Sequence, residues 1–291
     1  MAPDSRKTEN RKPKTENRAP KPKVLVLYGY GLNTDYECQF ALNRAGAEAQ
    51  RVHAGELLSG AVSLWDYHLM VVPGGFSWGD DHGAGVILGL RLRLALGSAL
   101  SEFIDAGRLV LGICNGFQVL VNTGLLPGLP GRPRERLAAL LPNDCGNFRD
   151  AWVHLKAQPS SPCVFTQGLD LLELPIRHGE GKFYAPAEVV TELADRGQIA
   201  LKYATAAGLP AQGRFPDNPN GALLDIAGIC DATGRVLGLM PHPEAYTTAT
   251  HHPTWTLDKE AYRRRGEPYP DQEGAGMAIF RNAVKYLEEM M

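Results

Sequence analysis

Residues 109–120 read Leu-Val-Leu-Gly-Ile-Cys-Asn-Gly-Phe-Gln-Val-Leu, and the rest of the chain is organised around them. The first five residues are a short apolar run, which is typical of a buried strand. Apolar residues then return at Phe117, Leu120 and Val121, with the spacing of a helix that packs on a sheet. Cys114 stands between the two patterns. The stretch therefore predicts a strand, a tight turn and a helix, with a cysteine at the turn, as in a nucleophile elbow.

Two glycines flank this cysteine symmetrically, Gly112 two residues before it and Gly116 two residues after it. Small residues are needed there because a Cβ at either position would collide with a tight turn. At a helix N-terminus the thiol meets the positive end of the helix dipole, which favours the thiolate. The N–H of Asn115 points the same way and can hold an oxyanion. Cys114 is therefore a candidate nucleophile, and a buried structural cysteine is the alternative.

The segments before this stretch alternate between strand-like and helix-like patterns. Strands are expected over residues 23–28, 49–53 and 68–72, and helices over residues 34–44 and 88–104. This rhythm predicts βαβ units and an α/β fold with a parallel sheet. Ligands of such sheets lie at the carboxyl ends of the strands, where Gly74, Gly75 and Cys114 fall.

The second half of the chain has shorter strand-like runs. Strand-like runs cover residues 151–157, 171–176, 199–203, 226–231 and 236–240. Residues 127–147 are rich in Pro, Gly and Arg and predict a surface excursion. Residues 247–273 contain three prolines and predict an irregular insertion, and residues 274–287 predict a closing amphipathic helix.

The charges of this 291-residue chain are unevenly distributed. Residues 1–23 carry eight Lys/Arg against three Asp/Glu, whereas the rest carries 22 against 29. A mildly acidic body argues against a nucleic-acid-binding protein. Residues 1–22 lack large apolar side chains and are predicted to form a disordered basic tail. We take residues 23–291 as one domain.

The five cysteines, an odd number with no Cys-x-x-Cys pair, make a disulfide framework or a zinc site unfavourable. No apolar run approaches the ~18 residues of a membrane span. The basic N-terminus lacks the apolar core of a secretory signal. We therefore expect a cytoplasmic protein with no metal and no membrane association.

A cysteine nucleophile usually works with a base and an orienting group. Two His-x-Glu pairs are available, His178 with Glu180 and His242 with Glu244. The second pair follows the predicted strand at residues 236–240, so it falls at a strand end near the level of the elbow. The flanking prolines fix its backbone. We prefer His242 as the base and Glu244 as its orienting group. The first pair, which is flanked by glycines, stays open as the alternative.

Taken together, these motifs resemble the class I glutamine amidotransferases. The elbow at residues 112–118 and Pro-His-Pro-Glu at residues 241–244 carry this resemblance. Within that class, the chain is similar to the family of glutaminase subunits of phosphoribosylformylglycinamidine synthase. The segments that carry this second similarity are Gly31-x-Asn-x-Asp35, Pro-Gly-Gly-Phe-Ser-Trp-Gly-Asp at 73–80, His-Gly-Glu-Gly at 178–181, Pro-Asn-Gly at 219–221 and Ile-Ala-Gly-Ile at 226–229. It covers about residues 24–244 and resumes weakly over 273–286.

The resemblance implies a flavodoxin-like domain with a mostly parallel central sheet and helices on both faces. It implies that Cys114 is the nucleophile, His242 the general base and Glu244 its orienting carboxylate. The N–H groups of Gly75 and Asn115 would form the oxyanion hole. The glutamine pocket would be lined by Gln118, His178, Gly179 and Glu180.

The implied activity is hydrolysis of glutamine through a γ-glutamyl thioester, with ammonia passed to a partner. That partner would be the synthetase subunit of phosphoribosylformylglycinamidine synthase, with a small accessory subunit as an optional third component. The chain has no G-x-x-x-x-G-K-[ST] sequence, so we expect no cofactor here, and ATP and Mg on the partner. A free-standing elbow-cysteine hydrolase, such as a γ-glutamyl hydrolase or a protease-like relative, and a non-catalytic scaffold subunit are the alternatives.

Overall fold

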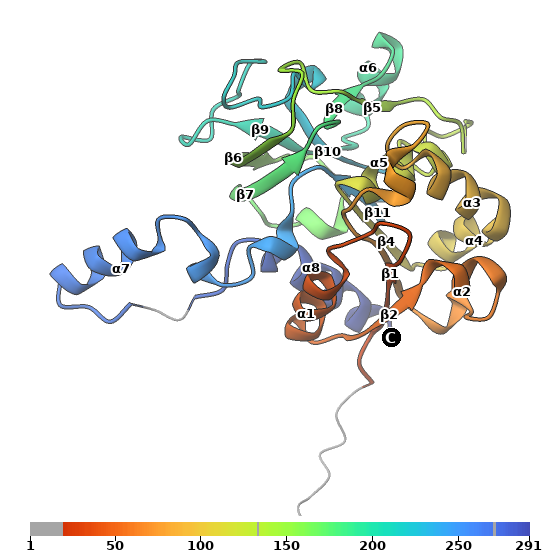
Figure 1. The fold of residues 1–291 in the computed structure, drawn as a ribbon, viewed down its shortest axis with the longest axis horizontal. Coiled ribbons are helices and arrows are strands. Elements are labelled where there is room, and N and C mark those ends of the chain that lie inside the picture. The colour runs from red at the N-terminus through yellow and green to blue at the C-terminus, as the bar shows by residue number, and fades with distance from the viewer. Residues whose placement is uncertain (1–19, 133, 270–271) are drawn as a thin grey trace, which may run out of the picture.

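In the residues that the structure describes, nine strands form one central sheet in the order β2–β1–β3–β4–β11–β10–β9–β6–β7 (Figure 1). This computed structural model describes residues 20–132, 134–269 and 272–291. The strands are β1 (Lys23–Tyr28), β2 (Glu48–His53), β3 (Leu69–Val72), β4 (Leu109–Ile113), β6 (Arg149–Ala157), β7 (Leu171–His178), β9 (Ile199–Ala204), β10 (Ile226–Cys230) and β11 (Val236–Leu239). The tail predicted over residues 1–22 lies almost wholly outside the described residues.

The strands from β2 to β11 in this order are parallel. All residues of β3, β4 and β11 are buried, because helices cover both faces of this part of the sheet. Val72 of β3 pairs with Gly112 of β4, and Leu239 of β11 pairs with Ile113. The carboxyl ends of these three strands therefore meet at one edge of the sheet, as the sequence predicted.

The other strands, from β10 to β7, are antiparallel to their neighbours. They come from the second half of the chain, and they extend the parallel core into a mixed sheet. A separate antiparallel pair joins β5 (Ala139–Leu141) to β8 (Lys182–Tyr184), so the segment expected as a surface excursion contains a short strand. The predicted α/β class is confirmed.

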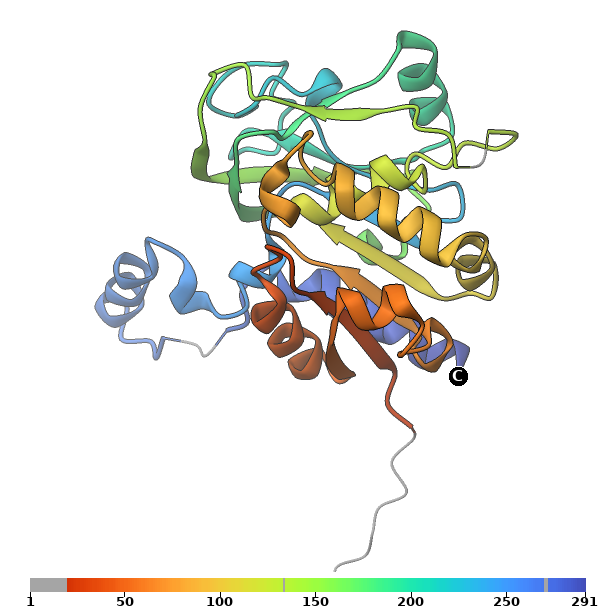
Figure 2. The same cartoon turned by 45° about the vertical axis from the view of Figure 1, so that its right-hand side comes forward.

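Helices lie on both faces of the parallel strands, as predicted (Figure 2). α1 and α8 pack together on one face, and α2, α3, α4 and α5 lie on the other. The helix bounds are Asp35–Ala45 (α1), Ala54–Ser59 (α2), Val86–Leu96 (α3), Ala99–Asp105 (α4), Asn115–Thr123 (α5), Ala187–Asp195 (α6), Trp255–Arg264 (α7) and Met277–Met290 (α8).

The prediction of a single helix over residues 88–104 is wrong. Two helices, α3 and α4, occupy this segment, and they are separated at Gly97. Gly97 has φ +49° and ψ −126°, a conformation that residues with a Cβ rarely adopt. Apolar residues continue on both sides of this glycine. The apolar periodicity therefore predicted one helix where the structure has two.

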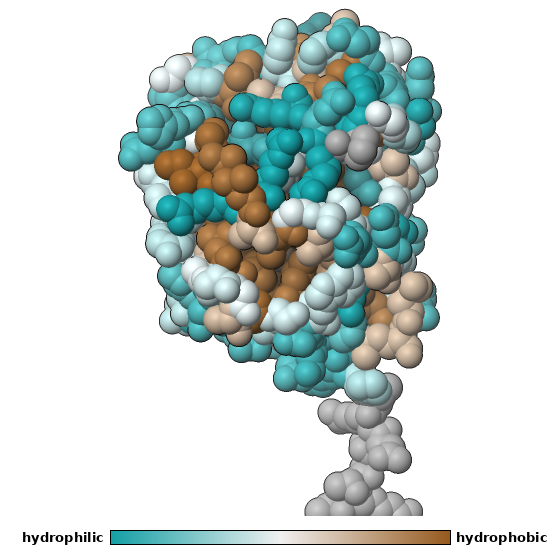
Figure 3. All heavy atoms as spheres, turned by 90° about the vertical axis from the view of Figure 1, so that its right-hand side faces the viewer, coloured by the Kyte–Doolittle hydropathy of each residue, from teal (hydrophilic) through white to brown (hydrophobic). Residues whose placement is uncertain are grey.

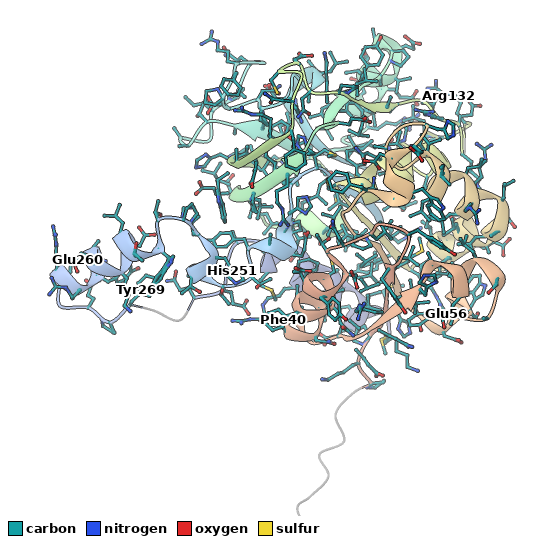
Figure 4. The ribbon with its side chains drawn as sticks, in the orientation of Figure 1. Phe40, Glu56, Arg132, His251, Glu260 and Tyr269 are labelled. Carbon is teal, nitrogen blue, oxygen red and sulfur yellow. The ribbon has the colours of Figure 1, made fainter. Side chains whose placement is uncertain are left out.

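Residues 249–269 form an arm that stands away from the body, with α7 near its tip (Figure 1). Glu260 and Tyr269 lie on the outstretched part, and His251 lies near the base (Figure 4). A bridge between Thr248 and Glu273 closes the base. The insertion expected to be irregular therefore contains a helix, so that description was wrong for residues 255–264.

Apolar side chains gather on the face of the protein that carries α2, α3 and α4 (Figure 3). On α3, Leu90 and Leu94 are 54% and 75% exposed, although Leu88 and Leu92 of the same helix are fully buried. Among the described residues no helix is both long and apolar enough to cross a membrane.

Candidate active site

Cys114 forms the turn between β4 and α5, in a backbone conformation that is unusual for a residue with a side chain. Its φ is +51° and its ψ is −106°. Such a conformation persists where the surroundings hold it in place. The N–H of Cys114 donates to the carbonyl of Leu239 on β11 at 2.8 Å, and its carbonyl accepts the N–H of Gln118 at 3.2 Å. Strand, turn and helix therefore occur as predicted, and the turn is fixed on both sides.

The two flanking glycines are required by close backbone contacts. A Cβ on Gly112 would lie 2.7 Å from the carbonyl oxygen of Gly116, and a Cβ on Gly116 would lie 1.8 Å from the carbonyl oxygen of Val72. Neither position can take a side chain unless the backbone shifts. The glycine spacing thus allows α5 to start directly against the ends of β3 and β4.

His242 and Glu244 lie on the segment that follows β11, at the same sheet edge as Cys114. The imidazole Nδ1 of His242 is 2.6 Å from Oε1 of Glu244, and both side chains are buried. Glu244 belongs to the 3₁₀ turn Pro243–Ala245. The N–H of His242 donates to the carbonyl of Pro175 at 2.8 Å. A Cβ on Gly74 would lie 2.8 Å from Cε1 of His242, so this glycine leaves room for the ring.

The surroundings of His242 favour its protonated form. Burial by itself lowers the pKa of His242, but the negative charges of Glu244 and of a Cys114 thiolate outweigh it and raise the pKa to about 10. With Nδ1 held by Glu244, Nε2 is the free ring nitrogen, and it is buried with no hydrogen-bond partner. The Cys114 thiol donates to the carbonyl of Arg177 at 3.6 Å. The site therefore places a cationic imidazole within electrostatic reach of the sulfur.

The Asn115 side chain ties the elbow to the loop after β3. Its Oδ1 accepts the N–H of Ser77 at 3.2 Å. Its Nδ2 donates to Oδ1 of Asp80 at 3.1 Å and to Oε1 of Gln118 at 2.9 Å. These three bonds fix the position of the elbow relative to the 74–80 loop, on which Gly75 lies.

Gly75 has φ +144°, and a Cβ there would lie 2.4 Å from the carbonyl oxygen of Gly31. The loop is held by the N–H of Asn33 donating to Gly74 O at 3.0 Å and by the N–H of Phe76 donating to Gly31 O at 2.9 Å. Neither bond uses the N–H of Gly75. That donor and the N–H of Asn115 at the first position of α5 remain as the candidate oxyanion donors.

A cavity of about 200 Å³ opens above the sulfur. It is lined by Gly75, Phe76, Asp80, Cys114, Gln118, Phe148, Arg177, His178, Gly179 and Glu180. The structure thus brings the predicted pocket residues Gln118, His178, Gly179 and Glu180 together around Cys114. Gln118 is oriented by its Nε2, which donates to the carbonyl of Glu180 at 2.6 Å.

His178 and Glu180 do not form a hydrogen-bonded pair like His242 and Glu244. The ring Nδ1 of His178 is 3.2 Å from Oδ1 of Asn143, and burial together with the charge of His242 lowers the pKa of His178 to about 3. The Glu180 carboxylate instead accepts the N–H of Ala84 at 3.4 Å. A neutral imidazole with no carboxylate partner is poorly suited to act as the base, so the geometry favours His242.

Asp80 and Arg177 line the cavity, and the sequence analysis did not single them out. Each could have been found from its position in the sequence, because Asp80 is the last residue of the 73–80 motif and Arg177 directly precedes His178. Burial and the nearby charge of Glu180 raise the pKa of Asp80 to about 6. Phe76 and Phe148 also lie at the cavity, with ring centroids 6.4 Å apart and about half of each side chain exposed.

The cysteines at the other positions are free: Cys38, Cys163 and Cys230 are buried, and Cys145 is exposed. Cys114 is the cysteine that lines the cavity. Over residues 20–132, 134–269 and 272–291, no three His, Cys, Asp or Glu side chains are grouped as metal ligands would be.

The fold and this site define a glutamine amidotransferase domain: the chain belongs to the CobB/CobQ-like glutamine amidotransferase domain family, which matches residues 21–287. It is 45% identical to phosphoribosylformylglycinamidine synthase subunit PurQ of Methanococcus maripaludis over 92% of this chain and 98% of that protein. The PurQ subunit of Dehalococcoides mccartyi is 41% identical over 93% of this chain and 99% of that protein. A solved chain of PurLQS from Thermotoga maritima aligns with a TM-score of 0.66 and 27% identity, over 92% of this chain and 99% of that one.

Proposed function

We propose that this chain is the glutaminase subunit of phosphoribosylformylglycinamidine synthase. It hydrolyses the side-chain amide of glutamine and supplies ammonia to a synthetase subunit that makes formylglycinamidine ribonucleotide for purine biosynthesis. The observation that carries this proposal is the convergence of Cys114, His242 and Glu244 at one sheet edge. It is supported by the similarity to PurQ subunits over nearly the whole of both chains.

In the first half of the reaction, the Cys114 sulfur attacks the amide carbon of glutamine. The N–H groups of Gly75 and Asn115 hold the negative oxygen of the tetrahedral intermediate. The imidazolium of His242 gives its proton to the departing nitrogen, so that ammonia leaves and a γ-glutamyl thioester remains. Glu244 stabilises the imidazolium until this proton is transferred, and its contact with Nδ1 leaves Nε2 free for the proton transfer.

In the second half, water attacks the thioester. His242 is now neutral and takes a proton from that water, which is its role as general base. The tetrahedral intermediate collapses, the carbon–sulfur bond breaks, and glutamate leaves as the thiolate and the imidazolium are restored. The γ-carboxyl group then releases its proton to water, so that glutamine and water give glutamate, ammonia and one proton.

The partner supplies the ATP-dependent step, so ATP and Mg bind to the synthetase subunit and this chain carries no cofactor. The similarity to a chain in the structure of PurLQS from Thermotoga maritima supports a complex of this chain with partner subunits, which we take to be the synthetase and, as an optional third component, a small accessory subunit. The five free cysteines fit the reducing cytoplasm, where we place the complex.

The test is kcat/KM for glutamine hydrolysis by the chain alone, with the synthetase, and with the synthetase plus ATP and ribonucleotide substrate. We expect a poor glutaminase alone and full activity in the complete complex, because a partner that binds the active geometry more tightly shifts the population towards it. Full activity of the isolated chain would instead favour the free-standing hydrolase, and inactivity under all three conditions would favour the scaffold.

A further inference from the structure

The arm at residues 249–269 stands away from the body, and its helix has little packing of its own (Figure 1). Helix α7 has ten residues, and within the described part of the chain none of them is buried. Leu257 on this helix is 68% exposed. A helix of this length is marginal in water by itself, and helices in proteins owe most of their stability to packing. The arm therefore has the properties of an element that packs against a partner.

A cavity of about 560 Å³ lies between α7 and the body, on the far side of the catalytic turn from the cavity above Cys114. We call it the arm cavity. Two carboxylates line it, Glu173 from β7 and Asp258 from α7. Its lining also includes three tyrosines, Tyr246, Tyr262 and Tyr269. The arm cavity thus combines acceptors with aromatic rings.

The arm cavity is acidic. Among the described residues, the Asp258 carboxylate contacts the hydroxyl of Thr254, 3.3 Å from Oδ2, and no cation. Arg265 lines the cavity too, but its Nε lies 3.0 Å from Oε2 of Glu267. Burial raises the pKa of Tyr246, and nearby acidic groups raise it further, namely those of Glu173, Tyr269 and Asp258. Carboxylates and aromatic faces together suit a cationic side chain.

The base of the arm adjoins the turn that carries the catalytic Glu244. Tyr246, which lines the arm cavity, is two residues after Glu244. The N–H of Gly276 donates to the carbonyl of Tyr246 at 3.1 Å, and a Cβ on Gly276 would lie 1.9 Å from the carbonyl oxygen of Pro243. The chain that returns from the arm therefore packs directly against the catalytic turn.

Strand β7 leads from the arm cavity to the elbow. Glu173, Pro175 and Arg177 alternate along it, so they share one face of the strand. The carbonyl of Pro175 accepts the N–H of His242 at 2.8 Å, and the carbonyl of Arg177 accepts the Cys114 thiol at 3.6 Å. A molecule bound in the arm cavity therefore contacts a strand that positions both His242 and Cys114.

We propose that the arm is a docking site for the synthetase subunit and that the arm cavity binds a lysine or arginine side chain of that subunit. The negative charge of Asp258 and the tyrosine rings supply the complementarity to this cation. The synthetase is the occupant because the cavity adjoins the two segments that position the catalytic groups, where a partner that activates the glutaminase must act. The inference rests on the proposed function for the identity of this partner.

The test is the Kd of the full chain for the synthetase, measured by isothermal titration with Asp258→Asn and Glu173→Gln. The two residues line the same cavity, but Asp258 lies in the first turn of α7 and Glu173 lies on β7. A change that both variants share therefore comes from the cavity and not from the stability of α7. The matched control is Glu260→Gln, because Glu260 carries the same charge on the same helix and does not line the arm cavity.

We expect Asp258→Asn to raise the Kd about 10–100-fold, as loss of a charge-assisted hydrogen bond does. Glu173→Gln should raise it as well, and Glu260→Gln should change it less than about threefold. Added salt should narrow the difference between the wild type and Asp258→Asn, because it screens the charge. An unchanged Kd in both cavity variants would overturn the proposal. A weaker complex with Asp258→Asn alone would place its effect in α7 and would overturn the cavity assignment.

A second copy of this chain is the other candidate occupant. Sedimentation of the chain alone decides between the two: a dimer that dissociates in Asp258→Asn would assign the arm cavity to a second copy and overturn the proposal. We expect the wild type and the variant to sediment alike.

The titration requires no turnover, so it is independent of the proposed function. If the synthetase binds through the arm cavity but the complex lacks glutaminase activity, the proposed function fails and the docking site stands. If the complex is an active glutaminase and its Kd is the same in both cavity variants, the docking site fails and the proposed function stands. If the synthetase does not bind this chain at all, the docking site fails, and glutamine hydrolysis by the chain alone still tests the glutaminase.

Discussion

Glu244 Oε1 holds the Nδ1 of His242 at 2.6 Å while the backbone N–H of His242 is bonded to Pro175 on β7. The imidazole is therefore positioned from two directions, by the turn that follows β11 and by the antiparallel half of the sheet. Because Glu244 is also the leading cause that raises the pKa of His242, position and protonation state depend on one carboxylate. Both can be altered by one substitution.

Glu244→Gln keeps the size of the side chain but removes its charge. The pKa of His242 should fall from about 10, because the carboxylate no longer stabilises the imidazolium. In the wild-type complex kcat/KM should stay level through neutral pH and fall as the pH rises through about 10. In the variant this alkaline limb should move to lower pH, and kcat should drop. A pH–rate profile with an unmoved alkaline limb would show that His242 is not the titrating group.

His242→Ala and His178→Ala should affect different kinetic constants. Loss of His242 removes the proton carrier, so kcat should fall by a factor of about 10²–10⁴. Loss of His178, which is neutral and bonded to Asn143, should act mainly by raising KM. Steady-state kinetics of both variants in the same complex make the comparison. The reverse pattern would move the base to His178.

The sequence predicted the elbow and its partners well because both are local. Gly112, Cys114 and Gly116 lie within five residues, and His242 and Glu244 are separated by one proline, so short motifs contain most of their geometry. The parallel strands could also be predicted, since strands that are buried on both faces have continuous apolar sequences.

What the sequence did not predict depends on contacts between distant segments. Asp80 has a raised pKa in part because the fold places Glu180, a distant residue in the sequence, in the same cavity. The pairing of His178 with Asn143 has the same origin. The helix of the arm lacked a sequence signal of its own, because α7 buries no residue and therefore has no core-facing apolar stripe.

Cys114→Ala should abolish glutamine-dependent synthesis in the complex but leave synthesis from added ammonia intact, because the synthetase site is elsewhere. A glutamine-shaped electrophile should label Cys114 and spare the buried Cys38, Cys163 and Cys230 and the exposed Cys145. Mass spectrometry of the labelled peptides identifies the site. Loss of the ammonia-dependent reaction in the variant would contradict this division of labour.

Gly116→Ala should destabilise the fold and distort the elbow, because its Cβ would lie 1.8 Å from the carbonyl oxygen of Val72. Overpacking against backbone costs about 1–3 kcal/mol or more in the free energy of unfolding. Gly179→Ala is the matched control, since a Cβ at Gly179 would meet no atom within 4 Å. Thermal unfolding of both variants measures the difference, and equal midpoints would show that the turn tolerates a side chain.

The Asp80 carboxylate should lower the stability of the protein at neutral pH, because burial and the charge of Glu180 both disfavour its ionised form. Its pKa of about 6 in the folded protein lies above the ordinary 3.8, so the folded state holds this proton more tightly than the unfolded chain. Stability from this group is therefore present below pH 3.8 and lost as the pH rises to about 6. Asp80→Asn never acquires the charge and should avoid that loss.

At pH 7 we expect Asp80→Asn to unfold about 2–4 °C above the wild type, the shift given by roughly 1 kcal/mol in a domain of this size, since partial exposure to solvent reduces the cost of the charge. At pH 4 the two midpoints should coincide. Scanning calorimetry at both pH values, with the exposed Asp81→Asn as the control, measures the difference. A variant less stable than the wild type at pH 7 would mean that the bond to Asn115 outweighs the cost of burying the charge beside Glu180.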